Sequence, residues 1–568
     1  MDTPPGTTVY NLPPSPPIWD RLGVFYVSFC VIWTTLLIAG MAFCWVNRRD
    51  PILRLRGLKL SFSAITLLHI YWVLGQLQYS ILVVIPPIVA LNLQYFVMGI
   101  YFPLGIALFH ASNTRFLHVA KLQKKFTSHD LSIKTGCSGS RSPWLCRLMN
   151  MDYNMKITVF IGLGMIIQVF LTVGMWLACR KYHPAFGIPG TELRGATLPE
   201  QLLDMSRGWE WWPSLLWQFI WAWIVAPIMI WRAWGIRDTM GWRTQTIGCC
   251  ISNLHAAPMY LVASYVPAFA SVNMYFPISQ WVEISIFMFE IFTVFLPAFQ
   301  VMRQRVLVKH VSNSNIEWET ESQTLDSSSS ITQKVSADSS IAEKGGEMDY
   351  CDESMGDRLL TMGALNQALD DNPGPLQDFS ALSDFSGENI AFLTRLARWK
   401  ASWYAQPDKE QTLQAYNRAL ELYAIFISPR DAEFPLNLSS SDLRELEEVF
   451  EKAARILWGE AKVDPAVPFE TPRSAGSEST LTPSLESIAG RACYTGEIPE
   501  GFGPYVFDAA ERHIKYLVLT NTWPKFVKEM QSRRRSSETA RSDFTMSSGT
   551  TVVSRVSDKI TQLIRSFV

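Results

Sequence analysis

Two glutamates lie within one apolar stretch of the chain, where hydrocarbon would surround their carboxylates if the stretch crossed a membrane. Glu283 and Glu290 are seven residues apart, so a helix would place both on one face, turned toward its neighbours. A carboxylate is costly inside a bilayer and marks a candidate ligand-binding or proton-transfer site. The same groups also suit a structural network of hydrogen bonds between helices, and both interpretations stay open.

Polar residues in other apolar segments are candidate partners for these glutamates. The predicted intramembrane polar site comprises Glu283, Glu290, His69 and His255, with Gln76 and Asn92 as further candidates. Such a site would take a small-molecule ligand or act as a proton-linked switch. For Glu283 the alternative is that its carboxylate reaches the outer surface. The nine cysteines form no CxxC pair and no zinc-like spacing with histidine, so we expect neither a metal site nor a disulfide scaffold. We also expect no cofactor.

Seven apolar segments must position these residues. Because the hydrocarbon core is ~30 Å thick and a helix rises about 1.5 Å per residue, about 20 apolar residues make one membrane span. The segments are Gly23–Val46, Leu60–Ile85, Ile88–Phe109, Ile157–Ala178, Pro213–Ile230, Ile247–Ala270 and Ile278–Val301. We therefore predict a seven-transmembrane domain over residues 23–305, preceded by an extracellular leader over residues 1–22.

Basic residues predict the orientation of these spans. Arginines and lysines follow the first, third, fifth and seventh segments, and such residues are retained on the cytoplasmic side. We expect an integral protein of the plasma membrane, with membrane lipid as a partner, its N-terminus outside and its C-terminal half in the cytoplasm. The formal net charge of −1 gives no sign of binding to nucleic acid.

The composition changes sharply near residue 305. Residues 306–352 are rich in Ser, Thr, Asp and Glu, which predicts a disordered linker. Apolar residues then return at helical spacing over 353–531, interrupted by a Pro- and Ser-rich loop insertion over 460–504. Residues 532–568 form a basic tail with an amphipathic pattern from Val552 to Phe567. The predicted fold class is all-α: a seven-helix transmembrane bundle followed by a cytoplasmic helical bundle.

Three blocks of the C-terminal half resemble the regulator of G-protein signalling (RGS) domain, in that family's own order. They are DFSGENIAFLTRLARWK at Asp384–Lys400, YAIFIS at Tyr423–Ser428 and FDAAERHIKYLVLTNTWPKFV at Phe507–Val527. Together with the seven spans, they resemble the seven-transmembrane RGS proteins of fungi and plants. The spans themselves lack the DRY-type and NPxxY patterns of rhodopsin-like receptors, so the activating function of those receptors does not carry over.

The resemblance implies a partner and a surface. The partner would be the α subunit of a heterotrimeric G protein (Gα), and the residues that match the family's Gα contacts are Glu388, Asn389, Asn437, Leu517, Asn521 and Lys525. Asn521 and Lys525 stand where the family more often has Asp and Arg. The domain would not be an enzyme, because Gα supplies the arginine and the glutamine needed for GTP hydrolysis.

Three functions remain open on the sequence. The first is a membrane-anchored activator of Gα GTP hydrolysis, under the control of a ligand at the seven-helix bundle. The second is an orphan receptor or transporter whose RGS-like tail only scaffolds Gα. The third is a receptor that both activates and deactivates the same Gα.

Overall fold

A computed structural model describes residues 8–127, 153–328, 359–458 and 494–546, apart from single positions at 184, 207, 405, 406 and 433. The described residues are all-helical and contain no strand. The predicted all-α class is confirmed. The predicted amphipathic segment from Val552 to Phe567 lies outside the described residues, as do residues 329–352 of the predicted linker and 460–493 of the predicted insertion.

Within the described part of the chain, seven helical segments are long and apolar enough to cross a membrane. They are Arg21–Val46, Leu58–Gln78, Pro87–Phe126, Val159–Ala178, Trp209–Trp234, Trp242–Tyr265 and Gln280–Glu317. Their outer faces carry exposed apolar side chains such as Val31, Phe170 and Trp231, as expected where the neighbour is lipid. The lengths of these helices and their exposed apolar side chains therefore both support the predicted seven-span membrane protein.

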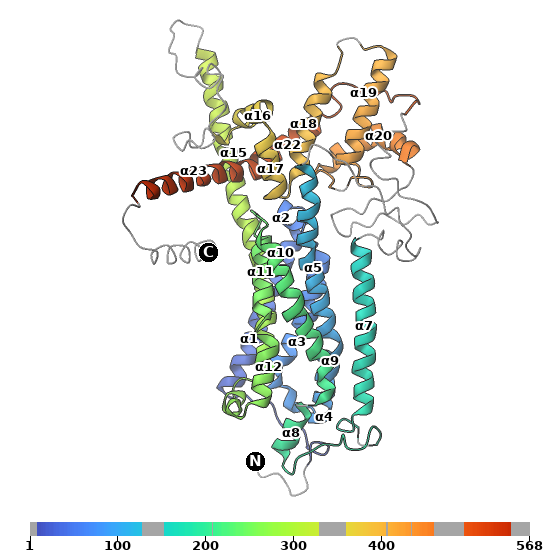
Figure 1. Cartoon of the computed structure of the whole chain (residues 1–568), viewed down its shortest axis with the longest axis vertical. Coiled ribbons are helices and arrows are strands. Elements are labelled where there is room, and N and C mark those ends of the chain that lie inside the picture. The colour runs from blue at the N-terminus through green and yellow to red at the C-terminus, as the bar shows by residue number, and fades with distance from the viewer. Residues whose placement is uncertain are drawn as a thin grey trace.

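The spans form one elongated bundle, with the N-terminus at one end and the C-terminal helices at the other (Figure 1). We call the latter the tail end. The first three spans contain α1 (Arg21–Val46), α3 (Leu58–Gln78), α4 (Pro87–Phe96), the π-helical turn η2 (Val97–Tyr101) and α5 (Phe102–Gln123). The fourth and fifth contain α7 (Tyr153–Ala178), α9 (Trp212–Phe219), η5 (Ile220–Val225) and α10 (Ala226–Trp234). The last two contain α11 (Trp242–Asn253), α12 (Ala256–Tyr265), α14 (Gln280–Glu290), η7 (Ile291–Phe295) and α15 (Leu296–Ser328).

Short helices lie between the spans or form their ends. They are α2 (Pro51–Arg54), η1 (Leu82–Val84), η3 (Lys124–Phe126), α8 (Leu198–Ser206), η4 (Trp209–Trp211), η6 (Pro267–Phe269) and α13 (Ala270–Asn273). Asp20 caps α1 by accepting a hydrogen bond from the Gly23 N–H at 2.7 Å, which satisfies a donor that the helix leaves free. Asp50 caps α2 in the same way. An acidic side chain thus caps both the first helix of the first span and the short helix that follows that span.

The third and seventh spans are longer than their apolar stretches. The third was expected to end near Phe109, but helix continues to Phe126; the seventh was expected to end near Val301, but α15 continues to Ser328. The first part of the predicted disordered linker, residues 306–328, is therefore helical, which corrects that expectation. No proline or glycine interrupts this stretch, and Val311 is buried in the core of the C-terminal helices, so tertiary packing overrides the polar composition.

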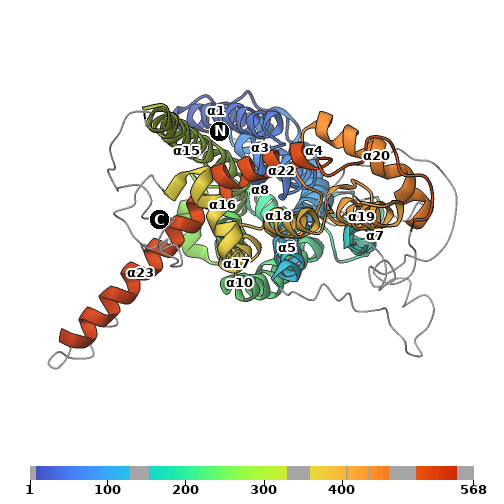
Figure 2. The same cartoon turned by 90° about the horizontal axis from the view of Figure 1, so that it is seen from above.

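The C-terminal helices form a second bundle with its own core, which we call the tail domain. Its elements are α16 (Met362–Asp371), α17 (Gly374–Leu382), α18 (Gly387–Ala401), α19 (Lys409–Leu422), η9 (Tyr423–Ile427), α20 (Ser440–Trp458), α22 (Asp508–Leu517), η10 (Val518–Thr522) and α23 (Trp523–Met546). Trp523, Phe392 and Phe450 are fully buried in its centre. Seen from above, these helices lie over the tail end of the membrane bundle, and α23 extends beyond it (Figure 2).

The boundaries of the tail domain differ from the predicted ones in two places. Helix α23 runs past residue 531 to Met546, through part of the predicted basic tail. At the end of the predicted insertion, Tyr494 is packed against the core, and its backbone N–H donates to the Asn417 side chain at 2.7 Å. That end of the insertion is therefore fixed to α19 and belongs to the folded domain.

Candidate functional site

Five of the six residues predicted to contact Gα surround one small hollow. Its volume is about 40 Å³. The tail-domain residues that line it include Glu388, Asn389, Asn437, Leu517 and Asn521. They come from three chain segments far apart in the sequence: two of these segments are blocks that carry the family resemblance, and Asn437 lies nine residues after the remaining block.

Local structure explains how these side chains converge. Glu388 and Asn389 occupy the first turn of α18, which starts at Gly387. Asn437 follows the turn after η9 and precedes α20. Leu517 ends α22, and Asn521 lies in the π-helical turn η10. Such a turn shifts the register of a helix, so η10 helps to determine where the Asn521 side chain points.

Lys525, the sixth predicted residue, does not line the hollow. Its ammonium pairs with the Asp384 carboxylate at 2.8 Å and donates to the Asn521 side chain at 2.9 Å. It lies one turn beyond Asn521 on the following helix, α23. The structure therefore places Lys525 behind the hollow, where it positions its neighbours.

Asp384 makes the largest number of contacts in this polar cluster, and it was not among the residues predicted from the sequence. The carboxylate is completely buried and accepts hydrogen bonds from Thr239 at 2.5 Å, Thr522 at 2.7 Å and Ser386 at 3.1 Å, besides pairing with Lys525. A buried carboxylate requires such complete satisfaction. The available sequence signal was an acidic residue two positions before the SGEN turn; its partners in distant segments gave none.

The membrane bundle covers the hollow from the other side. The bundle residues that line it are Pro51, Arg54, Leu55 and Met240. The Arg54 guanidinium, at the end of α2, donates to the Pro435 carbonyl at 2.9 Å. This contact fixes the tail-domain loop that carries Asn437.

Gln123, at the end of the third span, makes a paired contact with the start of α18. Its amide nitrogen donates to the Glu388 carboxylate at 2.9 Å, and its amide oxygen accepts from the Gly387 N–H at 3.1 Å. A Cβ at position 387 would lie 3.0 Å from that oxygen and 2.8 Å from the Ala381 side chain. Glycine therefore permits the close approach of the two elements.

The loop between the fifth and sixth spans provides a third contact. The Thr239 N–H donates to the Ser383 carbonyl at 3.0 Å, and its hydroxyl donates to Asp384. Asp238 holds this loop by accepting from the backbone N–H groups of Met240 and Arg243 at 2.8 and 2.6 Å. Burial raises the pKa of Asp238, while those hydrogen bonds oppose the shift.

Two aromatic side chains of the tail domain are buried among bundle residues. Phe385 is 1% exposed and lies edge-on to Phe116 of α5, with ring centroids 5.8 Å apart. Phe434 is 3% exposed and lies edge-on to Phe126 at the same separation. Among the described residues other than glycine, Phe385 alone has a positive φ, at 48°. This unfavourable backbone conformation is held by the surrounding packing.

Burial changes the acid–base behaviour of Glu388. Desolvation raises the pKa of its carboxyl from 4.5 to about 7, against the opposing effects of the Gln123 hydrogen bond and the Arg54 charge. The group that resembles a Gα contact is thus partly protonated near neutral pH while it faces the bundle.

The predicted intramembrane site is divided into two separate pairs. Glu290 is fully buried and accepts from His69 Nδ1 at 2.8 Å and from the Trp33 indole. Glu283 is 1% exposed and accepts from Gln76 Nε2 at 2.6 Å, while its other oxygen has no hydrogen-bond partner. The alternative in which Glu283 reaches the outer surface is therefore not observed.

His255 does not join either pair. It precedes α12, and its buried Nε2 has no hydrogen-bond partner. Asn92 also lies elsewhere, accepting from the Trp176 indole at 2.7 Å. The four predicted residues are therefore divided: Glu290 pairs with His69, Glu283 pairs instead with Gln76, and His255 lies apart. Each pair joins the second span to the seventh.

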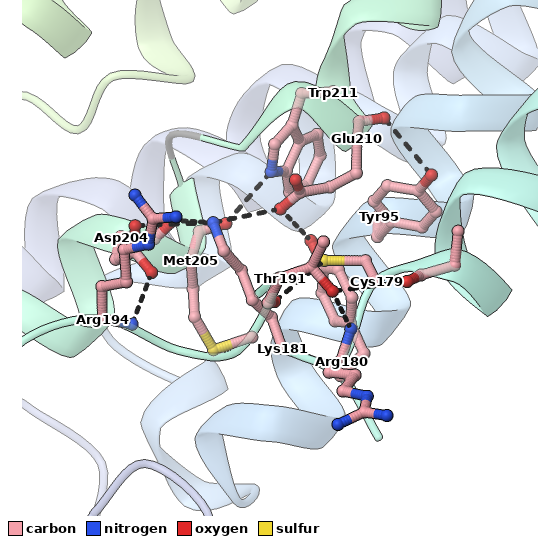
Figure 3. Close-up of polar contacts among 12 residues, drawn as sticks. Tyr95, Cys179, Arg180, Lys181, Thr191, Arg194, Asp204, Met205, Glu210 and Trp211 are labelled. Atoms are coloured by element: carbon pink, nitrogen blue, oxygen red, sulfur yellow. Dashed lines mark hydrogen bonds and ion pairs between the residues drawn. The ribbon is translucent and has the colours of Figure 1, made fainter. Parts of the chain in front are cut away.

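A further buried ionic cluster lies near the N-terminal end of the bundle (Figure 3). The Lys181 ammonium lies 3.6 Å from the Glu210 carboxylate and 3.5 Å from that of Asp204, and donates to the Asp204 carbonyl at 2.9 Å. Tyr95 donates to the Glu210 carbonyl at 3.3 Å. The cluster ties the long loop before the fifth span to the third span, a structural role that the sequence did not indicate.

No protein-family model, curated protein or solved structure matches this chain.

Proposed function

We propose that the protein is a membrane-anchored regulator of heterotrimeric G-protein signalling, similar to the seven-transmembrane RGS proteins. In this proposal it lies in the plasma membrane, with its N-terminus outside and its tail domain in the cytoplasm. The tail domain binds activated Gα and accelerates its GTP hydrolysis. The observation that carries the proposal is the convergence of Glu388, Asn389, Asn437, Leu517 and Asn521 on one hollow.

The mechanism requires no catalytic residue in this chain. Gα holds the arginine that stabilises the transition state and the glutamine that orients the attacking water. The tail domain would bind the mobile switch segments in their transition-state arrangement and so increase its population. Each 1.4 kcal/mol of preferential binding to that arrangement gives about tenfold in rate. Amides and a carboxylate can fix the geometry of the switch backbone, and Leu517 supplies an apolar contact.

The membrane bundle would add control by a small-molecule ligand. The buried pairs Glu290–His69 and Glu283–Gln76 join the second and seventh spans, and a ligand that competes for one partner of a pair would alter the packing of these spans. The bundle and the tail domain share the helix α15, so such a change can reach the tail domain.

Single-turnover GTP hydrolysis by candidate Gα subunits tests the proposal. The tail fragment should begin at Arg303, because α15 residues such as Val311 contribute to the tail core. We expect acceleration by the wild-type fragment, and its loss by about tenfold or more in Asn389→Ala and Glu388→Lys. Arg398→Ala, exposed near the far end of α18, should retain it. A folded fragment that accelerates hydrolysis by none of several Gα subunits would contradict the proposal.

A further inference from the structure

The surface that resembles a Gα-binding site is covered in this structure by the membrane bundle. Asn389 is 4% exposed and Asn521 is 5% exposed, and both line the hollow that Arg54 and Met240 close from the bundle side. A side chain buried to this extent cannot contact a second protein at the same time. Binding of Gα to these residues therefore requires the tail domain to separate from the bundle.

We propose that the tail end of the membrane bundle is an internal competitor of Gα, and that the structure represents the closed, autoinhibited form. This inference rests on the function proposed above. The membrane bundle and Gα would bind the same tail-domain residues, so binding of one prevents binding of the other. Any ligand that favours Gα binding must therefore favour separation, because the two equilibria are linked.

The contacts between the two parts have the character of a reversible interface. The direct polar contacts of Gln123, Thr239 and Arg54 use one or two hydrogen bonds each. Three of these five hydrogen bonds involve an ionisable group and two are neutral, and each contributes at most about 3 kcal/mol net because water can replace it when the interface opens. The apolar contribution centres on Phe385 and Phe434. Interfaces between domains of one chain are commonly of this mixed type and permit relative motion.

The conformation of Phe385 also favours a second state. Its positive φ is unfavourable for a residue with a side chain, and packing against Phe116 in the bundle accompanies it. After separation the bundle no longer holds this ring, so the backbone before α18 can relax. Because Glu388 and Asn389 follow within four residues, separation would uncover the predicted contacts and change the turn that presents them.

The bundle residues that contact the tail domain around the hollow come from several different spans and loops. Arg54 follows the first span, Gln123 ends the third, and Thr239 lies between the fifth and sixth. The seventh span continues as α15, whose Gln304 side chain donates to the Thr520 carbonyl beside Asn521 at 3.4 Å. A rearrangement among the spans would therefore displace several contacts together, as a population shift between two states requires.

Substitutions on the bundle side can test the competition and leave the tail-domain surface intact. Gln123→Glu replaces the donor to Glu388 by a carboxylate and should open the interface by charge repulsion. Thr239→Asp, facing Asp384, is an independent second variant. Lys121→Gln is the matched control, because it lies on the same helix at an exposed position and changes the net charge by the same amount.

Docking can be measured without Gα. Arg237 of the bundle and Glu529 of α23 have exposed side chains away from the hollow. The Arg237 guanidinium nitrogen lies 3.7 Å from the Glu529 carboxylate oxygen across the interface. An Arg237→Cys/Glu529→Cys pair in the full-length chain should react with a short thiol crosslinker in the closed form. We expect a reduced yield when Gln123→Glu or Thr239→Asp is added, and an unchanged yield with Lys121→Gln. The single-cysteine chains control for the native cysteines.

The decisive experiment measures binding of Gα, loaded with GDP and aluminium fluoride, to the full-length chain in lipid nanodiscs. We expect about tenfold weaker binding than to the fragment beginning at Arg303, a gain in affinity for Gln123→Glu and Thr239→Asp, and loss of binding after crosslinking. Equal binding by the closed full-length chain and the fragment would overturn the competition and leave the proposed function standing. If the fragment itself binds no Gα, the proposed function fails, and the competition fails with it.

Discussion

At the scale of single residues, the candidate site depends on groups that satisfy one another. The family resemblance pointed to Glu388, Asn389, Asn437, Leu517 and Asn521, and the structure brings these five to one hollow. Identification was feasible because the resemblance attaches to residue types in a fixed order. Asp384, Gln123 and Thr239 could not be identified in this way, since their importance comes from partners that are distant in the sequence.

The ion pair with Lys525 makes Asp384 important for the stability of the tail domain. In Asp384→Ala, the largely buried Lys525 ammonium would lose its counter-charge, and breaking a buried pair costs about 3 kcal/mol or more. In the fragment beginning at Arg303 the pair is no longer covered by Thr239 of the bundle, so we expect a smaller loss of the free energy of unfolding, about 1 to 3 kcal/mol, measured by denaturant titration. Adding Lys525→Met should recover part of the loss. A single variant as stable as the wild type would show that the pair contributes nothing.

Glu388 makes docking dependent on pH. Its pKa is about 7 when it faces the bundle and 4.5 ordinarily, so the closed form takes up a proton. Docking of the tail domain is therefore strongest below pH 4.5, and it weakens as the pH rises through the raised pKa of about 7. The charged groups beside it, Arg54 and Asp384, act in opposite directions on this pKa. We expect docking, measured as crosslinking yield, to be about tenfold more favourable at pH 6 than at pH 8.

Glu388→Gln provides the control for this pH dependence, since glutamine imitates the protonated acid and does not titrate. Docking of that variant should be nearly constant between pH 6 and 8. A pH dependence as steep as that of the wild type would mean that another group is responsible. The measurement needs a crosslinker whose reaction with thiols is corrected at each pH with a small-molecule thiol.

At the scale of helices, hydropathy located the seven spans but not the ends of the third and seventh. The apolar pattern of the third stops near Phe109, where His110, Asn113 and Arg115 follow, yet all three are buried within the bundle. Hydropathy records where lipid contact ends, whereas a helix continues as long as its backbone hydrogen bonds and its packing persist. The contacts with the tail domain depend on this extra length, so they were not visible in the sequence.

Helix α15 is the structural link between the two bundles. Val306 is 72% exposed and lies between the membrane part of α15 and the part buried in the tail core. Val306→Pro removes a backbone donor and forces a kink, at a cost of about 3 kcal/mol. We expect the Arg237→Cys/Glu529→Cys crosslink to decrease in that variant and to persist in Val306→Ala. An undiminished crosslink in the proline variant would show that the other contacts hold the tail domain in place without a straight α15.

At the scale of the whole molecule, the chain joins a membrane bundle to a helical tail domain through helix α15, which contributes to both, and through the contacts around the hollow. The composition alone predicted two bundles and a flexible linker, and the two bundles are present. Their docking was not predicted, because hydrophobic periodicity describes each element against its own core and contains no information on how two finished bundles meet. The consequence is a specific proposal, in which the membrane bundle controls access to the tail domain.

Single-turnover GTP hydrolysis with the full-length chain in nanodiscs tests this account most directly. Three chains should be compared at equal concentration with the same Gα: wild type, Gln123→Glu and Gln123→Glu/Asn389→Ala. We predict weak acceleration by the wild type, a clear increase with Gln123→Glu, and loss of that increase in the double variant. No acceleration by Gln123→Glu, in a preparation whose crosslinking shows an open interface, would contradict the assignment of this surface to Gα.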